Sequence, residues 1–227
     1  MNVVVGSMFR DSTGYLETYI AQIHGLRDLL EARGDKLRVV AVENDSQDDT
    51  HLRLDDWGGN VFCDLTLIKV HDDCPYYRSI DDPKRWRHLA WVANHVLEDV
   101  DDRDDVLLYV ESDLGWEPAE MLQLIDHTRL LPAVSCPNYA FEKGGRYYDI
   151  WGSRKDGRRF SPHRPYHPDW SEELMTMDSV ASVLAVRADI ARKTRFGDTN
   201  CFIGWCEDIR SQGHTIWYDP SLCVIHP

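Results

Sequence analysis

The chain has 227 residues, of which 43% are hydrophobic, and it carries a formal net charge of −14. This size and composition can bury one substantial core, and no linker, internal repeat or low-complexity tract divides residues 1–227, so we expect a single domain. Such an acidic surface repels polyphosphate and argues against a general nucleic-acid binder. No apolar run approaches the ~20 residues that a membrane-spanning helix needs.

The N-terminus enters a strand-like run directly, without the basic and apolar regions of a signal peptide. The six cysteines are scattered, with no Cys-x-x-Cys pair. This pattern predicts reduced thiols in a cytoplasmic protein.

Strand and helix patterns alternate through the first 130 residues. Apolar, β-branched runs predict strands at residues 3–5, 37–42, 61–70 and 106–110. Helical spacing of apolar residues predicts helices at about 12–33, 83–97 and 118–128. The alternation predicts an α/β fold, in which helices flank a mainly parallel central sheet.

The second half is less regular. We expect strands at residues 133–136, 180–186 and 215–218, with short helices at 188–192 and 207–212. Residues 138–178 are polar and aromatic, and they predict loops with short strands.

The most continuous apolar run, residues 106–110, ends at Glu111-Ser112-Asp113. In parallel sheets, ligands bind beyond the carboxyl ends of strands. Two carboxylates spaced i, i+2 at such an end can face one hard cation, and Mg²⁺ and Mn²⁺ prefer oxygen ligands. The pattern therefore predicts a Mn²⁺ or Mg²⁺ site, whereas the same residues away from a buried strand would indicate a surface loop.

A second polar stretch, residues 43–50, follows the second predicted strand. Its first carboxylate, Glu43, can accept a hydrogen bond from the N–H of a pyrimidine base. Asp48 and Thr50 can tie the turn through side-chain-to-backbone bonds. Taken alone, the stretch also fits a turn that caps a helix.

The third stretch runs from Gly204 to Pro220, with His226 beyond it. It contains Glu207-Asp208 beside the apolar Trp205, where one carboxylate can have a raised pKa, as a general base requires. Acids that complement the dipole of a helix N-terminus are the structural alternative.

In order and relative placement, these three stretches resemble the GT-A glycosyltransferases, especially GT2-like members. Residues 42–50 are similar to the family's V-D-D-x-S-x-D-x-T turn, with Glu43 at the first acid and Asn44 at the second. Glu111-Ser112-Asp113 matches the D-x-D motif, and residues 207–220 match the family's E-D…R…G…P ending. A weaker similarity to fungal capsule-type mannosyltransferases rests on residues 6–10, 42–46 and 148–154.

The resemblance implies a GT-A (Rossmann-like) fold, with a nucleotide-sugar-binding half at residues 1–130 and an acceptor-binding half at 131–227. It implies a metal-dependent transfer of a sugar from a UDP- or GDP-sugar to an acceptor hydroxyl. Asp113 would be the principal metal ligand, with Glu111 at the metal or the ribose and His226 completing the site. The implied donor contacts are Glu43, Asp45, Arg85, Arg87, Glu111 and Ser112.

Asp208 is the implied general base, oriented by Glu207, if the reaction inverts the anomeric centre. Similarity to the capsule-type group would instead imply retention, and the sequence leaves the two open. Aromatic residues are expected to stack on the acceptor: Tyr148, Trp151 and Trp205, with Tyr147, His163 and Trp170 as further candidates.

The acceptor is left open among a glycan, a small molecule, a protein and a modified DNA base. For the last, residues 143–164 could form a local basic groove, although the net charge opposes it. A nucleotidyltransferase and a non-catalytic carbohydrate-binding module are the remaining alternatives. The first would need a Gly-rich basic loop after the first strand, and residues 6–10 match that poorly.

Overall fold

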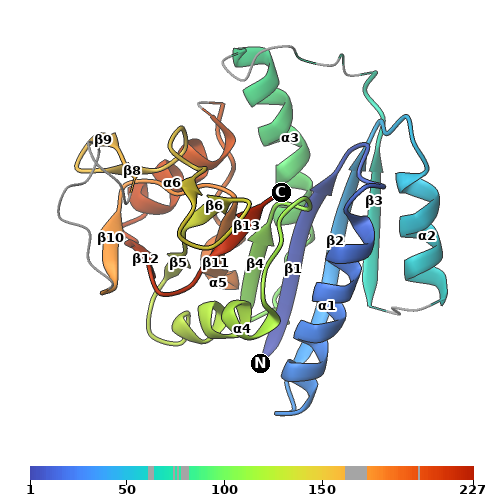
Figure 1. The fold of residues 1–227 in the computed structure, drawn as a ribbon, viewed down its shortest axis with the longest axis horizontal. Coiled ribbons are helices and arrows are strands. Elements are labelled where there is room, and N and C mark those ends of the chain that lie inside the picture. Colours follow the sequence, from blue (N-terminus) through green and yellow to red (C-terminus); the bar gives the residue numbers. More distant parts are fainter. Residues whose placement is uncertain (61–63, 74, 76, 78–81, 162–172, 199) are drawn as a thin grey trace.

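The computed structural model describes residues 1–60, 64–73, 75, 77, 82–161, 173–198 and 200–227. Their main feature is an eight-stranded sheet with the order β10-β12-β5-β11-β4-β1-β2-β3 (Figure 1). Its strands are β1 (Asn2–Phe9), β2 (Lys36–Asn44), β3 (Leu65–Val70), β4 (Val106–Val110), β5 (Ala133–Ser135), β10 (Met175–Met177), β11 (Val183–Arg187) and β12 (Ile216–Tyr218).

Helices cover both faces of this sheet, because alternate residues of its strands point to opposite faces. One face packs against α1 (Leu16–Glu31), α2 (Thr50–Asn60) and α4 (Pro118–His127). The other packs against α3 (Pro83–Asp99), α5 (Ala188–Ala191) and α6 (Cys201–Ser211). Val4 and Val40 contribute to the second core, and Val3, Val5 and Val39 to the first.

The strands β3, β2, β1 and β4 are parallel neighbours. Their carboxyl ends therefore meet at one edge of the sheet, where Phe9 lies opposite Glu43 in the register. The prediction of a mainly parallel sheet between helices is confirmed. The strand β11 is antiparallel to both β4 and β5, an insertion that the sequence pattern does not reveal.

Two helices differ from the prediction. The helix α2 was not predicted, and α6 begins at Cys201 rather than at the expected residue 207. Glu207 and Asp208 therefore lie well inside the helix rather than in its first turn.

Two smaller sheets stand beside the main one. The strands β13 (Val224–His226), β6 (Asn138–Ala140) and β7 (Arg146–Tyr147) form one, and β8 (Arg154–Lys155) with β9 (Arg158–Arg159) forms a hairpin. Paired backbone hydrogen bonds between Gly115 and Ile225 (2.8 and 2.7 Å) fasten β13 to the loop after β4. The C-terminal strand is thereby brought to the edge where the parallel strands end (Figure 1).

Among the residues described, none of the helices combines the length and apolar character needed to cross a bilayer. The boundary expected near residue 130 stays a prediction, since strands from both sides of it share the main sheet.

Candidate active site at the carboxyl ends of the strands

Glu111 and Asp113 follow β4, all five residues of which are buried. Between them, the Ser112 hydroxyl donates to the Met8 carbonyl (2.6 Å) and ties the loop to the end of β1. The Glu111 N–H donates to the Ser182 carbonyl (2.9 Å). These two bonds fix the backbone on both sides of Glu111, so the acids are held at the strand end.

His226 meets Asp113 from the other end of the chain. Its Nε2 lies 3.3 Å from Asp113 Oδ2, and this contact raises the pKa of His226. The Tyr148 ring stacks on the imidazole, with ring centroids 3.8 Å apart and planes 16° apart. The expected association of Asp113 with His226 is thus present in the geometry.

Asp149 is a third acid at this edge, and it is not among the site residues predicted from the sequence. It is buried, and its Oδ1 accepts hydrogen bonds from Ser182 Oγ (2.7 Å) and Asn138 Nδ2 (3.2 Å). Ser182 has a φ of +65°, a strained conformation for a residue with a side chain. Asp149 belongs to the stretch 148–154 that carries the capsule-type similarity, which was the available signal.

We call Glu111, Asp113 and Asp149 the acid group. Burial, together with the charge of Asp113, raises the pKa of Glu111 to about 8, and burial raises that of Asp149 to about 7. No lysine or arginine among the described residues forms an ion pair with any of the three. Since like charges disfavour one another's ionisation, the group is suited to an added cation.

The side chains at this edge supply only part of the ligand set that a divalent ion needs. In the described ranges, no three His, Cys, Asp or Glu side chains converge as a ready metal site. Asp113 and His226 are close enough to share an ion, with Glu111 beside them. Mg²⁺ and Mn²⁺ often take few ligands from protein and the others from substrate phosphates, which this arrangement would permit.

The end of β2 carries a second polar cluster. Glu43 is 2% exposed, and its Oε1 accepts from the Ser46 N–H (2.8 Å). The Asn44 side chain contacts His88 Nε2 through its oxygen (2.7 Å) and donates to Asp72 Oδ1 (3.2 Å). Asp45, with φ +51°, accepts from the Asp72 N–H through Oδ2 (3.2 Å). Most polar atoms of this cluster are therefore already paired within the chain.

The expected internal tie of this turn is confirmed. Asp48 Oδ1 accepts from both the Thr50 N–H (3.0 Å) and the Thr50 hydroxyl (2.5 Å). Although burial opposes it, hydrogen bonds from Thr50 and Thr13 lower the pKa of Asp48 to about 2. Asp48 is thus a structural anion rather than a ligand-binding one.

The two predicted arginines on α3 differ. Arg85 is half-buried and faces the acid-group edge, since its charge partly offsets the rise that burial causes in the pKa values of Tyr148 and Cys201. Arg87 is exposed and has no interaction with the residues described.

Trp205 requires a correction. It is 0% exposed, it packs against Tyr109 and Phe196, and its Nε1 donates to Thr194 Oγ1 (2.9 Å). A core residue of this kind cannot contact an acceptor. The same holds for Tyr147, which is buried with its hydroxyl bonded to Ser153 (2.8 Å).

The placement of Asp208 gives little support to its predicted role. Its Oδ2 accepts from the Arg195 N–H (2.7 Å), a contact that ties α6 to the preceding loop. Cys201, at the start of α6, is the part of this helix that lies near Glu111. Asp208 follows seven residues later, about 10 Å further along the helix axis. Glu207 is exposed, and the assignment of a base to this pair stays a prediction.

Tyr148 and Trp151, which were predicted to contact the acceptor, are 45% and 43% exposed. The Arg159 guanidinium lies 3.9 Å from the centroid of the Trp151 ring, a cation–π contact. His163 and Trp170 lie outside the described residues.

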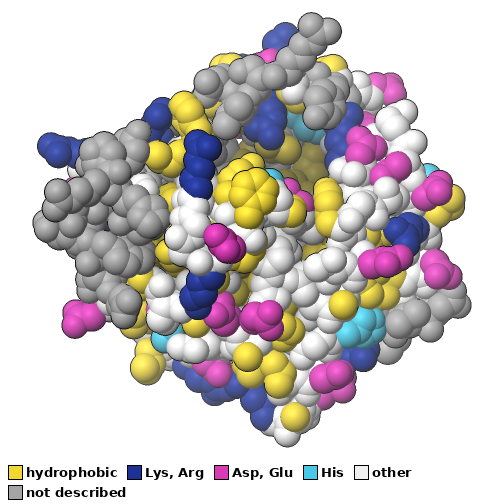
Figure 2. All heavy atoms as spheres, in the orientation of Figure 1, with side chains coloured by type: hydrophobic (Ala, Val, Ile, Leu, Met, Phe, Trp, Pro, Cys, Tyr) yellow, Lys and Arg dark blue, Asp and Glu magenta, His cyan; other side chains and the backbone are white. Residues whose placement is uncertain are grey.

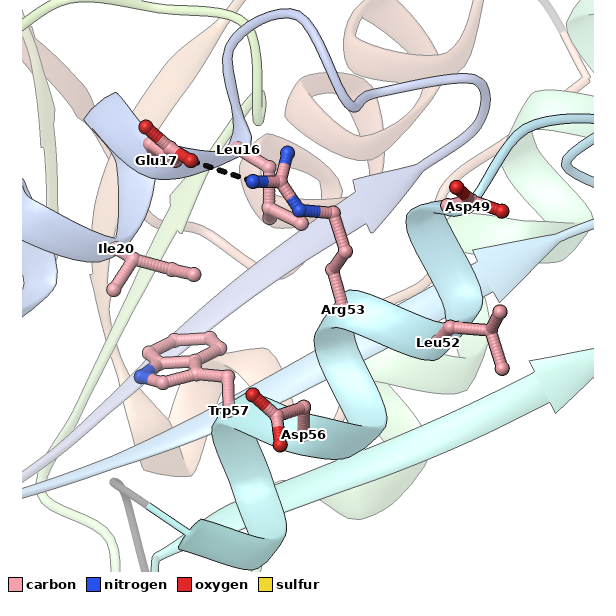
Figure 3. Close-up of a pocket in the computed structure, with 8 residues that line it drawn as sticks. All are labelled: Leu16, Glu17, Ile20, Asp49, Leu52, Arg53, Asp56 and Trp57. Carbon is pink, nitrogen blue, oxygen red and sulfur yellow. Dashed lines mark hydrogen bonds and ion pairs between the residues drawn. The ribbon is translucent and has the colours of Figure 1, made fainter.

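The space-filling view shows this face hollowed beside α3, near the C-terminal end of the chain (Figure 2). A separate groove of about 470 Å³ lies between α1 and α2, with Trp57 in its wall and the Arg53–Glu17 ion pair (2.5 Å) across it (Figure 3). None of the acid group lines this groove.

No protein-family model matches the sequence, and no curated protein matches it. Solved structures do match. S. aureus TarS (residues 1–349) in complex with UDP-GlcNAc aligns with a TM-score of 0.62 and 11% identity, over 99% of this chain and 58% of that one. A mannosyltransferase from Pyrobaculum calidifontis, PcManGT, in complex with GDP-Man and Mn²⁺, aligns with a TM-score of 0.57 and 16% identity, over 98% and 56%.

A mycobacterial protein aligns over 100% of this chain and 67% of its own, with a TM-score of 0.58 and 16% identity. The fold is therefore that of the GT-A glycosyltransferases, as expected. The chain spans about six-tenths of the TarS 1–349 structures with which it aligns.

Proposed function

We propose that this chain is a divalent-metal-dependent glycosyltransferase, which moves a sugar from a nucleoside-diphosphate sugar to an acceptor hydroxyl. The observation that carries the proposal is the acid group: three carboxylates beside His226, with no lysine or arginine partner among the described residues, at the ligand-binding edge of a glycosyltransferase fold. The donors in the TarS and PcManGT complexes, UDP-GlcNAc and GDP-Man, support a nucleotide-sugar as the substrate class.

For the donor, we assign the base end to the cluster at the end of β2 and the diphosphate end to the loop after β4. Glu43 and Asp45 lie at the first, and Glu111 and Ser112 at the second. Arg85 is the better placed of the two arginines to contact a phosphate, because it faces the edge, whereas Arg87 points to solvent.

Asp113 and His226, with Glu111, would hold Mn²⁺ or Mg²⁺, and the ion would supply neutralisation of the diphosphate leaving group. The chain itself supplies the orientation of these ligands. Ser112 anchors the loop to β1, Tyr148 stacks on His226, and Ser182 fixes the backbone of Glu111. Tyr148 and Trp151 are exposed on the acceptor side and can stack on a sugar or another ring. The cytoplasmic location stays a prediction from the sequence.

A hydrolysis screen tests the proposal. Purified protein is incubated with UDP- and GDP-sugars, with Mn²⁺, with Mg²⁺ or with a chelator, and nucleoside diphosphate release is measured. We expect release from at least one donor that depends on the metal and is lost in Asp113→Asn. Release that is independent of metal, or unchanged in that variant, contradicts the proposal.

A further inference from the structure

The β8–β9 hairpin carries an unusual concentration of positive charge. Residues 154–159 hold four cations and one acid, in a chain whose net charge is −14. In the strand register, Arg154 lies opposite Arg159, and Lys155 lies opposite Arg158. Like charges directly opposite each other destabilise a strand pair. We call these four residues the basic hairpin.

No carboxylate among the described residues is paired with these cations. None of the four cations forms an ion pair with any residue in the described ranges. Arg154 donates to the carbonyls of Trp151 (2.8 Å) and Ser153 (3.0 Å), and Lys155 donates to that of Thr176 (2.9 Å). Asp178, the acid that contacts the hairpin, is bonded to Gly157 N–H (2.6 Å) and paired with Arg210 (3.2 Å).

Burial and the charge of Arg159 lower the pKa of Arg154, which is the expected mark of a cation that lacks a counter-ion.

The hairpin is nevertheless firmly built. Asp156 and Gly157 both have positive φ (+51° and +73°), as a tight two-residue turn between strands requires. Phe160, which ends the hairpin, is 0% exposed and donates its N–H to the Ser153 carbonyl (3.0 Å). A rigid platform therefore holds the like charges together, and Arg159 is further fixed over Trp151.

We propose that the basic hairpin, with Trp151, binds a phosphate group of the acceptor, so that the acceptor is a compact, soluble phosphorylated molecule. That the bound molecule is an acceptor rests on the proposed function, whereas the binding of an anion rests on the hairpin alone. The segment from Tyr148 to Arg154 connects the two regions, because Tyr148 stacks on His226 at its start and Arg154 enters the hairpin at its end.

Guanidinium groups suit phosphate oxygens, since they donate two parallel hydrogen bonds. A compact ligand is favoured over a long polyanion, because the strongly acidic remainder of the chain would repel a duplex or an anionic membrane surface.

Calorimetric titration with sodium tripolyphosphate in the presence of EDTA tests this site without any glycosyl transfer. We expect Arg158→Gln/Arg159→Gln to weaken binding at least tenfold. The matched control is Arg129→Gln/Arg187→Gln, which removes two exposed arginines that are paired with Asp126 and Asp189, and it should bind as the unaltered protein does. Equal binding by the hairpin variant and the control overturns the proposal.

Two further measurements distinguish phosphate binding by the hairpin from misfolding and from binding of a larger polyanion. Arg158→Lys/Arg159→Lys keeps the charge but loses the paired guanidinium donors, so it should bind more tightly than the Gln variant and less tightly than the unaltered protein. A Tm of the Gln variant no lower than that of the unaltered protein excludes simple misfolding as the cause of its loss. A short DNA duplex and vesicles of phosphatidylglycerol should not bind at physiological salt, and hairpin-dependent binding of either overturns the compact acceptor.

Metal-dependent donor hydrolysis should be unchanged in the hairpin variant. If the unaltered protein binds tripolyphosphate through the hairpin but hydrolyses no donor, the proposed function fails while the anion site stands.

Discussion

The acid group and the basic hairpin are opposite in charge and alike in construction. Each holds side chains of one sign close together: Glu111, Asp113 and Asp149 in one, and Arg154, Lys155, Arg158 and Arg159 in the other. His226 is the single partner paired with the acid group among the described residues, and the hairpin has no paired acid. Both differ from sites such as Arg38, a cation that sits between two acids.

Uncompensated like charge costs stability. We therefore interpret its presence at two rigid places as the mark of the ligand-binding sites that we propose. The acid group fits a divalent cation with a diphosphate, and the hairpin fits an anion. The acid group lies at the strand ends, where the fold places ligands, while the hairpin lies outside the main sheet and follows from no general rule of the fold.

The largest effect is expected at the acid group. Asp113→Asn removes the negative charge nearest His226, and we expect it to lower metal-dependent donor turnover by about 10²–10³-fold, the loss of several kcal/mol of electrostatic stabilisation. Steady-state rates at saturating Mn²⁺ measure this. Asp189→Asn, which alters an exposed acid far from the strand ends, is the control and should retain full turnover. Equal rates in both variants would show that turnover does not depend on the acid group.

The stability of the metal-free protein should depend on pH in a way set by the same acids. The pKa values of Glu111 and Asp149 are raised on folding, to about 8 and about 7, so the native state binds more protons than the unfolded state between about pH 4 and pH 8. The stabilisation is complete at the acidic end of this window and is lost as the pH rises through these values.

We therefore expect Tm to fall by at least about 3 °C between pH 6 and pH 8.5. Scanning calorimetry measures the change, and Asp149→Asn should make the slope shallower. Added Mn²⁺ should restore Tm at the higher pH. A flat profile, or one that rises with pH in this range, would contradict the account of the acid group.

A variant of Asp208 tests whether this residue acts as a general base or only stabilises the structure. Because its carboxylate accepts from the Arg195 N–H, Asp208→Asn should change turnover by less than about threefold and lower Tm by about 2 °C. A general base would instead contribute about 10²–10⁴-fold. Parallel measurements of turnover and Tm decide, and a loss of turnover at unchanged Tm would restore Asp208 as the base.

The smallest effect is expected at the hairpin itself. Arg158→Gln relieves the repulsion from Lys155, and we expect it to raise the stability by about 0.2–1 kcal/mol. Arg38→Gln is the contrasting variant, since it leaves Asp99 and Asp104 without their shared cation and should lower Tm. If Arg158→Gln lowers Tm as Arg38→Gln does, the hairpin cations are structural and their charge is compensated.

The first half of the chain is predicted well from the sequence, because periodic patterns and strand-end acids are local. The runs at residues 37–42 and 106–110 became β2 and β4, and the polar residues after each strand lie at the same edge, as parallel strands require. The tie between Asp48 and Thr50 was likewise readable from their spacing.

The second half of the chain is harder to predict, because its contacts join residues that are distant in sequence. Asp149 joins the acid group only when β11 inserts beside β4 and brings Ser182 to it. Trp205 was expected to contact the acceptor, but α6 begins at Cys201, before the expected start at residue 207, and holds the Trp205 ring in the core. The like-charged pairs of the hairpin depend on a register that the turn at Asp156-Gly157 sets.

Titration of the protein with Mn²⁺, followed by electron paramagnetic resonance with and without UDP or GDP, tests the central claim most directly. The account predicts one Mn²⁺ per chain, bound more tightly when a nucleoside diphosphate is present and lost in Asp113→Asn. Absence of Mn²⁺ binding under both conditions, or equal binding by the variant, would contradict it.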